Sequence, residues 1–194
     1  MLKGYTTRQE VENYLLITID ASFYAQVDAW IESVEAYIDR RTGRNFVADV
    51  AASVRKYDGD GSNIQLIDDA VAITKVEVDD EEIVPDSSTE EGYFAYPAND
   101  LPKTKLETDG NLFAQGRQNV EVTAKWGYSV AVPTDIKRAA TVFVAGIINF
   151  SDEGKGEVSS ETIGAYSVSY KTTQERDDFN RAIETLKAYK KFTF

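Results

Sequence analysis

The residues of this sequence best equipped for chemistry are carboxylates that cluster between Glu77 and Glu91. Eight acidic residues and no basic one lie in this stretch, which includes four consecutive acids at Asp79–Glu82. Paired carboxylates can hold Mg²⁺ for phosphoryl chemistry or act as acid and base on a glycosidic bond. Such a pair needs a pocket that gives its two members different roles, whereas neighbouring side chains of an extended chain point to opposite sides. The run therefore indicates a solvated turn, with a glycosidase or a Mg-dependent nuclease as the alternative.

A second acidic motif, residues 58–63 (DGDGSN), resembles part of a calcium-binding loop. The EF-hand pattern requires glycine at its sixth position and glutamate at its twelfth. This sequence has Asn63 and Asp69 at those positions. Aspartate and glycine also favour tight turns. The motif therefore predicts a hairpin turn rather than a metal site.

Two residue types that build many active sites are missing, because the chain has no histidine and no cysteine. Their absence excludes Ser-His-Asp and Cys-His catalysis, imidazole metal sites and thiolate zinc sites. The glycine motifs of phosphate-binding loops and of the nucleophile elbow are missing too. We therefore expect no enzymatic activity, no metal and no cofactor. With no disulfide to form, intracellular folding is the default expectation.

The charge balance limits the partners of this chain. It has 33 acidic and 21 basic residues, which gives a net charge of −12. Tight DNA binding requires clustered lysine and arginine, so it is not expected here. The charge suits a protein that lets DNA pass, or an acidic DNA mimic that inhibits a DNA-binding enzyme. No apolar run reaches the roughly 20 residues of a membrane span, and the N-terminus lacks the apolar core of a secretory signal.

Four helices are predicted where apolar residues recur three and four positions apart. The pattern is strongest in the third, through Ile136, Ala139, Ala140, Phe143, Val144, Ile147 and Ile148. This helix is expected to pack against the second, which Gly43 should end. The predicted helices span residues of about 7–17, 21–43, 134–150 and 173–190.

The middle of the chain, about residues 51–130, changes to the period of two that is typical of strands. Its clearest strand segments are 64–67, 73–78 and 119–126. The sequence therefore predicts an α+β fold, mainly an α-helical bundle with a small antiparallel β-sheet inserted in the middle. We expect one domain over residues 1–194.

Several of these segments, taken in order, resemble the head–tail connector (adaptor, head-completion) family of long-tailed bacteriophages and prophages. Their order and spacing cover most of residues 7–172. They are the helix Trp30–Gly43, the turn and strand at 57–61 and 73–78, the segment 120–136 (VEVTAKWGYSVAVPTDI) and the segment 163–170 (IGAYSVSY).

The resemblance implies a subunit of a closed ring beneath the portal protein, sharing its twelvefold symmetry in the virion. Such subunits can remain monomeric in solution until the portal is present. The ring extends the DNA channel without binding DNA specifically, and it docks the next head-completion (stopper) or tail protein. The implied location is the head–tail interface of a virion assembled in the bacterial cytoplasm. The long β segment departs from the shortest, nearly all-helical members.

Subunits of a ring meet head-to-tail, so each needs two different contact patches. A polar loop after the third helix and the C-terminal stretch are the candidates for partner binding. Removal of residues 187–194 is expected to weaken portal docking while the monomer stays folded. The lysines of the C-terminal stretch also interact favourably with the negative end of the last helix. The partner-binding candidates are Asp152, Glu153, Lys155, Lys187, Lys190, Lys191, Phe192 and Phe194.

The consecutive acids are candidates for the lining of the ring's lumen. Like-charge repulsion at such a surface would keep DNA from adhering to the channel wall. These residues are Asp79, Asp80, Glu81 and Glu82.

Overall fold

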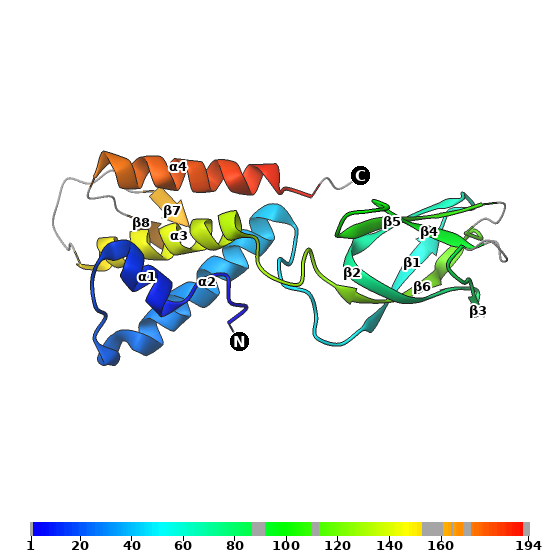
Figure 1. Cartoon of the computed structure of the whole chain (residues 1–194), viewed down its shortest axis with the longest axis horizontal. Coiled ribbons are helices and arrows are strands. Elements are labelled where there is room, and N and C mark those ends of the chain that lie inside the picture. Colours follow the sequence, from blue (N-terminus) through cyan, green and yellow to red (C-terminus); the bar gives the residue numbers. More distant parts are fainter. Residues whose placement is uncertain are drawn as a thin grey trace. The chain divides into compact units, whose positions relative to one another are not determined.

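The computed structural model describes residues 2–86, 92–109, 113–152, 161–163, 165–168 and 172–191. They fall into two compact units. The helical unit consists of Met1–Arg44 with Val132–Phe194, and the sheet unit is Asn45–Ala131. The sheet unit is therefore inserted between the second and third helices of the chain, and Figure 1 shows the elements of each unit.

The helical unit is built around α3 (Thr134–Asp152), which packs against α1, α2, α4 and β8. Its apolar residues are buried on several faces, as a helix at the centre of a bundle requires. Tyr37 of α2 meets Phe143 edge to face with ring centroids 5.9 Å apart, so the predicted packing of these two helices is confirmed. The other elements of this unit are α1 (Arg8–Leu15), η1 (Ala21–Phe23), α2 (Tyr24–Thr42), β7 (Glu161–Ile163), β8 (Tyr166–Val168) and α4 (Thr173–Ala188).

The helix ends follow local sequence signals. Gly43 ends α2 in the left-handed conformation at φ 70°, and its N–H donates to the Asp39 carbonyl at 2.7 Å. Glycine adopts this conformation without the strain that a Cβ atom brings. Thr172 and Glu175 form the reciprocal capping box that begins α4.

The sheet unit contains one six-stranded antiparallel sheet with the order β1-β6-β2-β5-β4, and β3 pairs with the end of β2. Its core contains Ile67, Val76, Leu106, Val120 and the fully buried Trp126. The strands are β1 (Ser53–Gly59), β2 (Ile64–Val78), β3 (Glu81–Glu82), β4 (Tyr93–Tyr96), β5 (Lys103–Thr108) and β6 (Gly116–Trp126).

Two sequence expectations about this sheet are wrong in detail. Segments 64–67 and 73–78 form one long strand, β2, whose register shifts around Ala70 let its two halves pair with different neighbours. The turn after Gly59 does not close a hairpin, because β6 lies between β1 and β2 in the sheet.

The α+β class is confirmed, but the chain is not mainly a helical bundle. The sheet forms a compact unit of its own, with buried aromatic and branched side chains. Strands of this length bury enough apolar surface to make a separate core. No helix in the described part of the chain combines the length and hydropathy that crossing a bilayer requires.

Candidate functional site

The acidic run forms the tip of the β2–β3 hairpin. Val78 pairs with Glu81, and the two residues between them, Asp79 and Asp80, have φ angles of 53° and 67°. Two consecutive positive φ angles are typical of a type I′ turn, which matches the twist of the strands that it joins. The Asp79 N–H donates to the Asn119 carbonyl at 2.9 Å, and the Asn119 side-chain amide donates to the Asp79 carboxylate at 3.3 Å.

This geometry does not arrange the acids as a catalytic pair. All four side chains of Asp79–Glu82 are exposed, so no pocket gives them different roles. The neighbouring carboxylates Glu77 and Glu121 form ion pairs with Lys75 and Lys56. Within the described residues, no group of three or more acidic side chains is placed to hold a metal ion.

The acids of the DGDGSN motif support a turn. Asp60 accepts a hydrogen bond from the Ser62 backbone N–H at 2.9 Å, and Asp58 accepts one from the Gln118 N–H at 2.7 Å. The Ser62 hydroxyl and N–H hold the pKa of Asp60 below its usual value. Both residues are exposed, and each uses its carboxylate to hold a backbone N–H group of the turn.

A cluster of cations forms where α2 and α4 end side by side. The Lys191 N–H donates to the Thr42 carbonyl at 2.7 Å, and Arg44 Nε donates to the Tyr189 carbonyl at 2.7 Å. These bonds join two chain segments that are about 145 residues apart. We use the name basic pole for the basic residues at and just after these two helix ends, which are Arg40, Arg41, Arg44, Lys187, Lys190 and Lys191.

Part of this charge has a structural explanation. Cations near a helix C-terminus interact favourably with its last carbonyl groups, and two such ends meet here. Arg44 fits this role through its hydrogen bond to Tyr189, and Lys187 pairs with Glu184 at 2.6 Å. Arg40, Arg41 and Lys190 are exposed and form no ion pair with the described residues. The basic pole therefore carries surplus positive charge on a chain whose net charge is −12.

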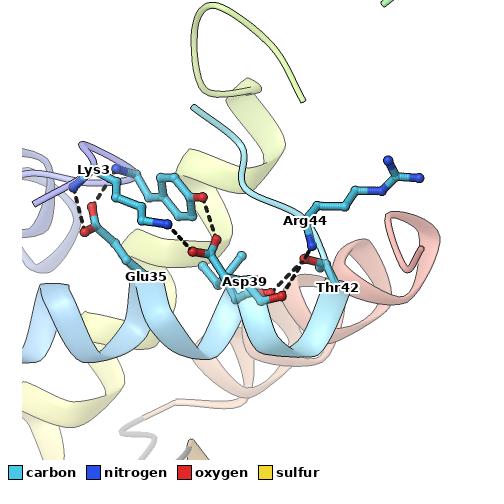
Figure 2. A network of polar contacts seen from close by, with 7 residues as sticks. Lys3, Glu35, Asp39, Thr42 and Arg44 are labelled. Carbon is cyan, nitrogen blue, oxygen red and sulfur yellow. Dashed lines mark hydrogen bonds and ion pairs between the residues drawn. The ribbon is translucent and has the colours of Figure 1, made fainter. Parts of the chain in front are cut away.

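A polar network, shown in Figure 2, joins the N-terminal segment of the chain to α2. Glu35 is 2% exposed and accepts the backbone N–H groups of Lys3 at 2.8 Å and Tyr5 at 2.9 Å. Asp39 accepts the Tyr5 hydroxyl at 2.6 Å and pairs with the Lys3 ammonium. Both Asp39 oxygens are therefore engaged by the N-terminal segment (Figure 2).

The C-terminal lysines belong to this folded pole and do not form a separate tail. Besides the bonds of Arg44 and Lys191, the Tyr189 hydroxyl donates to Asp135 at 3.1 Å. Removing residues 187–194 would delete these contacts with α2 and α3. The truncated monomer is expected to stay folded but to lose these contacts, so point substitutions test docking with less effect on stability.

A second buried carboxylate joins three helices. Asp178 of α4 accepts hydrogen bonds from Tyr14 at 3.3 Å, Arg138 at 3.2 Å and Gln174 at 3.2 Å. Burial, together with the Asp178 charge, raises the pKa of Tyr14 to about 12. These hydrogen bonds link α1, α3 and α4, so Asp178 has a structural role.

The remaining predicted contact residues are Asp152, Glu153, Lys155, Phe192 and Phe194. Asp152 is the last residue of α3. Glu153, Lys155, Phe192 and Phe194 lie outside the described residues. Sequence reasoning missed the arginines of the basic pole as interaction candidates, although Arg40 and Arg41 sit in the last turn of α2 just as Lys187 does in α4.

Comparison with known proteins gives matches at the level of structure. The chain matches no family model and no curated protein. One solved structure is described as the neck of an empty GTA particle computed with C6 symmetry. The match has a TM-score of 0.60 and 13% identity, and it covers 100% of this chain and 94% of that chain.

Two further matches come from particles of the same kind. The neck of a native GTA particle computed with C12 symmetry gives a TM-score of 0.51 at 13% identity, over 96% of this chain and 88% of that one. The virion of a native gene transfer agent (GTA) particle gives 0.55 at 14% identity, over 100% and 94%. At such low identity, these matches establish a shared fold over nearly the whole length of each chain.

Proposed function

We propose that this chain is a structural protein of the neck of a phage-like particle, a head–tail connector without enzymatic activity. The observation that carries the proposal is the match to a chain of a gene transfer agent neck, which covers both chains almost completely. A shared fold alone does not define function. Here, however, both the helical unit and the sheet unit are included in the match, in the same chain order.

The surface chemistry supports a role in assembly. Copies that meet head-to-tail around a ring use two different patches, and a rotation that closes gives a ring. This chain offers distinct surfaces of opposite charge, with the basic pole on the helical unit and acidic turns on the sheet unit. We propose a ring of twelve copies beneath the portal protein, formed from subunits that can be monomeric in free solution.

The acidic hairpin tip at Asp79–Glu82 is proposed to face the DNA channel. Its four carboxylates are exposed, which suits repulsion of DNA better than catalysis. DNA then passes through the ring without specific binding. A glycosidase or nuclease would need a pocketed carboxylate pair, and a DNA mimic would not benefit from a basic pole.

The predicted contact residues are proposed to join this chain to its neighbours in the neck. Lys187 and Lys190 are exposed at the basic pole, where a partner can reach them. The neighbours that the function requires are a second copy of this chain, the portal protein above the ring, and a stopper or tail protein below it.

Electron microscopy of the full chain mixed with purified portal rings tests this function. We expect a second ring of density on the portal, with a mass of twelve copies by native mass spectrometry. The chain without portal serves as the control for spontaneous assembly. Absence of any association with the portal would contradict the proposed function, whereas hydrolysis of DNA or glycan that depends on Asp79–Glu82 would support the enzyme alternative.

A further inference from the structure

A small groove on the sheet unit combines apolar side chains with two exposed carboxylates. It lies at the start of β2, has a volume of about 350 Å³, and is lined by Asp58, Asp60, Ser62, Ile64, Gln65 and Leu66. This volume is at the lower end of the range for ligand pockets, so the groove fits long side chains better than a large cofactor.

The lining of the groove defines the ligand that it would accept. Ile64 and Leu66 are 39% and 54% exposed and provide an apolar surface. Asp58 and Asp60 are exposed and form no ion pair with the described lysines and arginines. A matching ligand therefore combines an apolar stem with a cationic head, as lysine and arginine do.

The buried Gln65 points to the same ligand. Its side chain is 9% exposed, and its amide nitrogen donates to the Leu66 carbonyl at 3.0 Å. The side-chain oxygen of Gln65 accepts no hydrogen bond from the described residues. A buried acceptor without a donor costs free energy, which a ligand in the groove would recover only if its N–H groups reach this oxygen.

We propose that this groove binds the basic pole of a second copy of the chain, so that Lys187 and Lys190 of one subunit lie against Asp58 and Asp60 of the next. The inference rests on the proposed ring and identifies the partner of the basic pole as a neighbouring copy. Charge complementarity supports a second copy, because the basic pole has surplus cations and the groove has carboxylates that form no ion pair with the described residues. Repeating this contact gives the head-to-tail arrangement that a ring needs.

The contact should depend strongly on its charges and on ionic strength. Lysine stems cover the apolar surface of Ile64 and Leu66, while their ammonium groups reach the carboxylates. Exposed charges are screened beyond about 8 Å at physiological ionic strength, so the contact weakens as salt is added.

Cross-linking of engineered cysteines tests the contact cleanly, since the natural chain has no cysteine. Two full-length variants are mixed, Asn63→Cys beside the groove and Ala188→Cys beside Lys187, both at exposed positions. A short bismaleimide should join them into a heterodimer. The matched control pairs Asn63→Cys with Ala25→Cys, an exposed alanine at the opposite end of α2, and should give little product.

Charge reversal then tests the chemistry. Lys187→Glu with Lys190→Glu on the Ala188→Cys chain should reduce the heterodimer by about tenfold or more. Asp58→Lys with Asp60→Lys on the Asn63→Cys chain should do the same, and mixing the two reversed chains should restore the product. Because Asp58 and Asp60 also accept hydrogen bonds from backbone N–H groups, near-ultraviolet circular dichroism is used to check that the aspartate variants are folded. If the aspartate variants do not fold, the loss of heterodimer in the lysine variants alone tests the contact.

The outcomes separate this inference from the proposed function. Rings on the portal together with a heterodimer that is lost on reversal and restored on double reversal support both. If rings form on the portal but the Asn63→Cys and Ala188→Cys chains do not cross-link, the proposed contact is wrong and the ring proposal stands. The contact is also wrong if charge reversal at Lys187 and Lys190 abolishes portal binding but leaves the cross-link unchanged. Loss of both rings and cross-link overturns both.

Discussion

Glu35 is expected to hold the N-terminal segment of the chain on α2. The substitution Glu35→Ala leaves the N–H groups of Lys3 and Tyr5 without their carboxylate acceptor. A hydrogen bond to a charged group contributes about 1.5–3 kcal/mol, so two of them set an upper range of about 3–6 kcal/mol. Because the released segment regains water, we expect a loss of about 2–4 kcal/mol in the free energy of unfolding. Glu35→Gln keeps one acceptor and should give a smaller loss.

Two measurements follow this substitution. Chemical denaturation monitored by far-ultraviolet circular dichroism gives the change in the free energy of unfolding, and amide hydrogen exchange reports on Lys3 and Tyr5 directly. The matched control is Glu184→Gln. Its exposed side chain pairs with Lys187 alone among the described residues, so the substitution should cost no more than about 0.5 kcal/mol. If Glu35→Ala loses as little as this control, and the two amides stay protected, the role assigned to Glu35 is refuted.

Three further predictions concern single positions. Gly59→Ala should destabilise the sheet unit by about 2 kcal/mol or more, since a Cβ there would lie 2.0 Å from the Ala114 carbonyl oxygen; thermal unfolding measures this. Burial and Asp178 raise the pKa of Tyr14 from 10.0 to about 12, which favours the neutral phenol in the folded state. The contribution of neutral Tyr14 to the free energy of unfolding is therefore complete below pH 10 and is lost as the pH rises towards 12. In alkaline unfolding curves, the Tyr14→Phe variant should lack this pH-dependent contribution. Asp80→Gly should stabilise the chain by about 0.5–1 kcal/mol, because residue 80 has a φ angle of 67°; unchanged or lower stability in denaturant would contradict the assigned turn.

The local parts of the fold could be predicted from the sequence because their signals are local. Apolar residues three and four apart placed α3 and its buried face. Gly43 and the Thr172–Glu175 pair marked helix ends through chemistry that acts over a few residues. The acidic run was interpreted as a solvated turn, and it lies at the tip of the β2–β3 hairpin.

The arrangement of the sheet depends on pairings that no local pattern contains. β6 pairs with both β1 and β2 from a distance of tens of residues, and the register shifts of β2 let one strand contact different neighbours. The alternation of apolar and polar residues predicted strands in this region, but it could not show which strands pair with each other. It also could not show that the sheet has enough core to form a unit of its own.

The basic pole illustrates the same limit for the candidate site. Lys187 and Lys190 were recognised as contact candidates on their own helix. Their association with Arg40 and Arg41 arises only when the ends of α2 and α4 meet through the Arg44–Tyr189 hydrogen bond. Basic residues in the last turns of both helices were a visible signal, but each also has a sufficient explanation in the helix dipole.

Cryo-electron microscopy of intact particles that carry this chain tests its proposed place most directly. We expect twelve copies in a closed ring around the DNA channel, immediately below the portal, with both units of the chain resolved in each copy. Particles whose neck lacks this chain, or a chain found elsewhere in the particle, would contradict it.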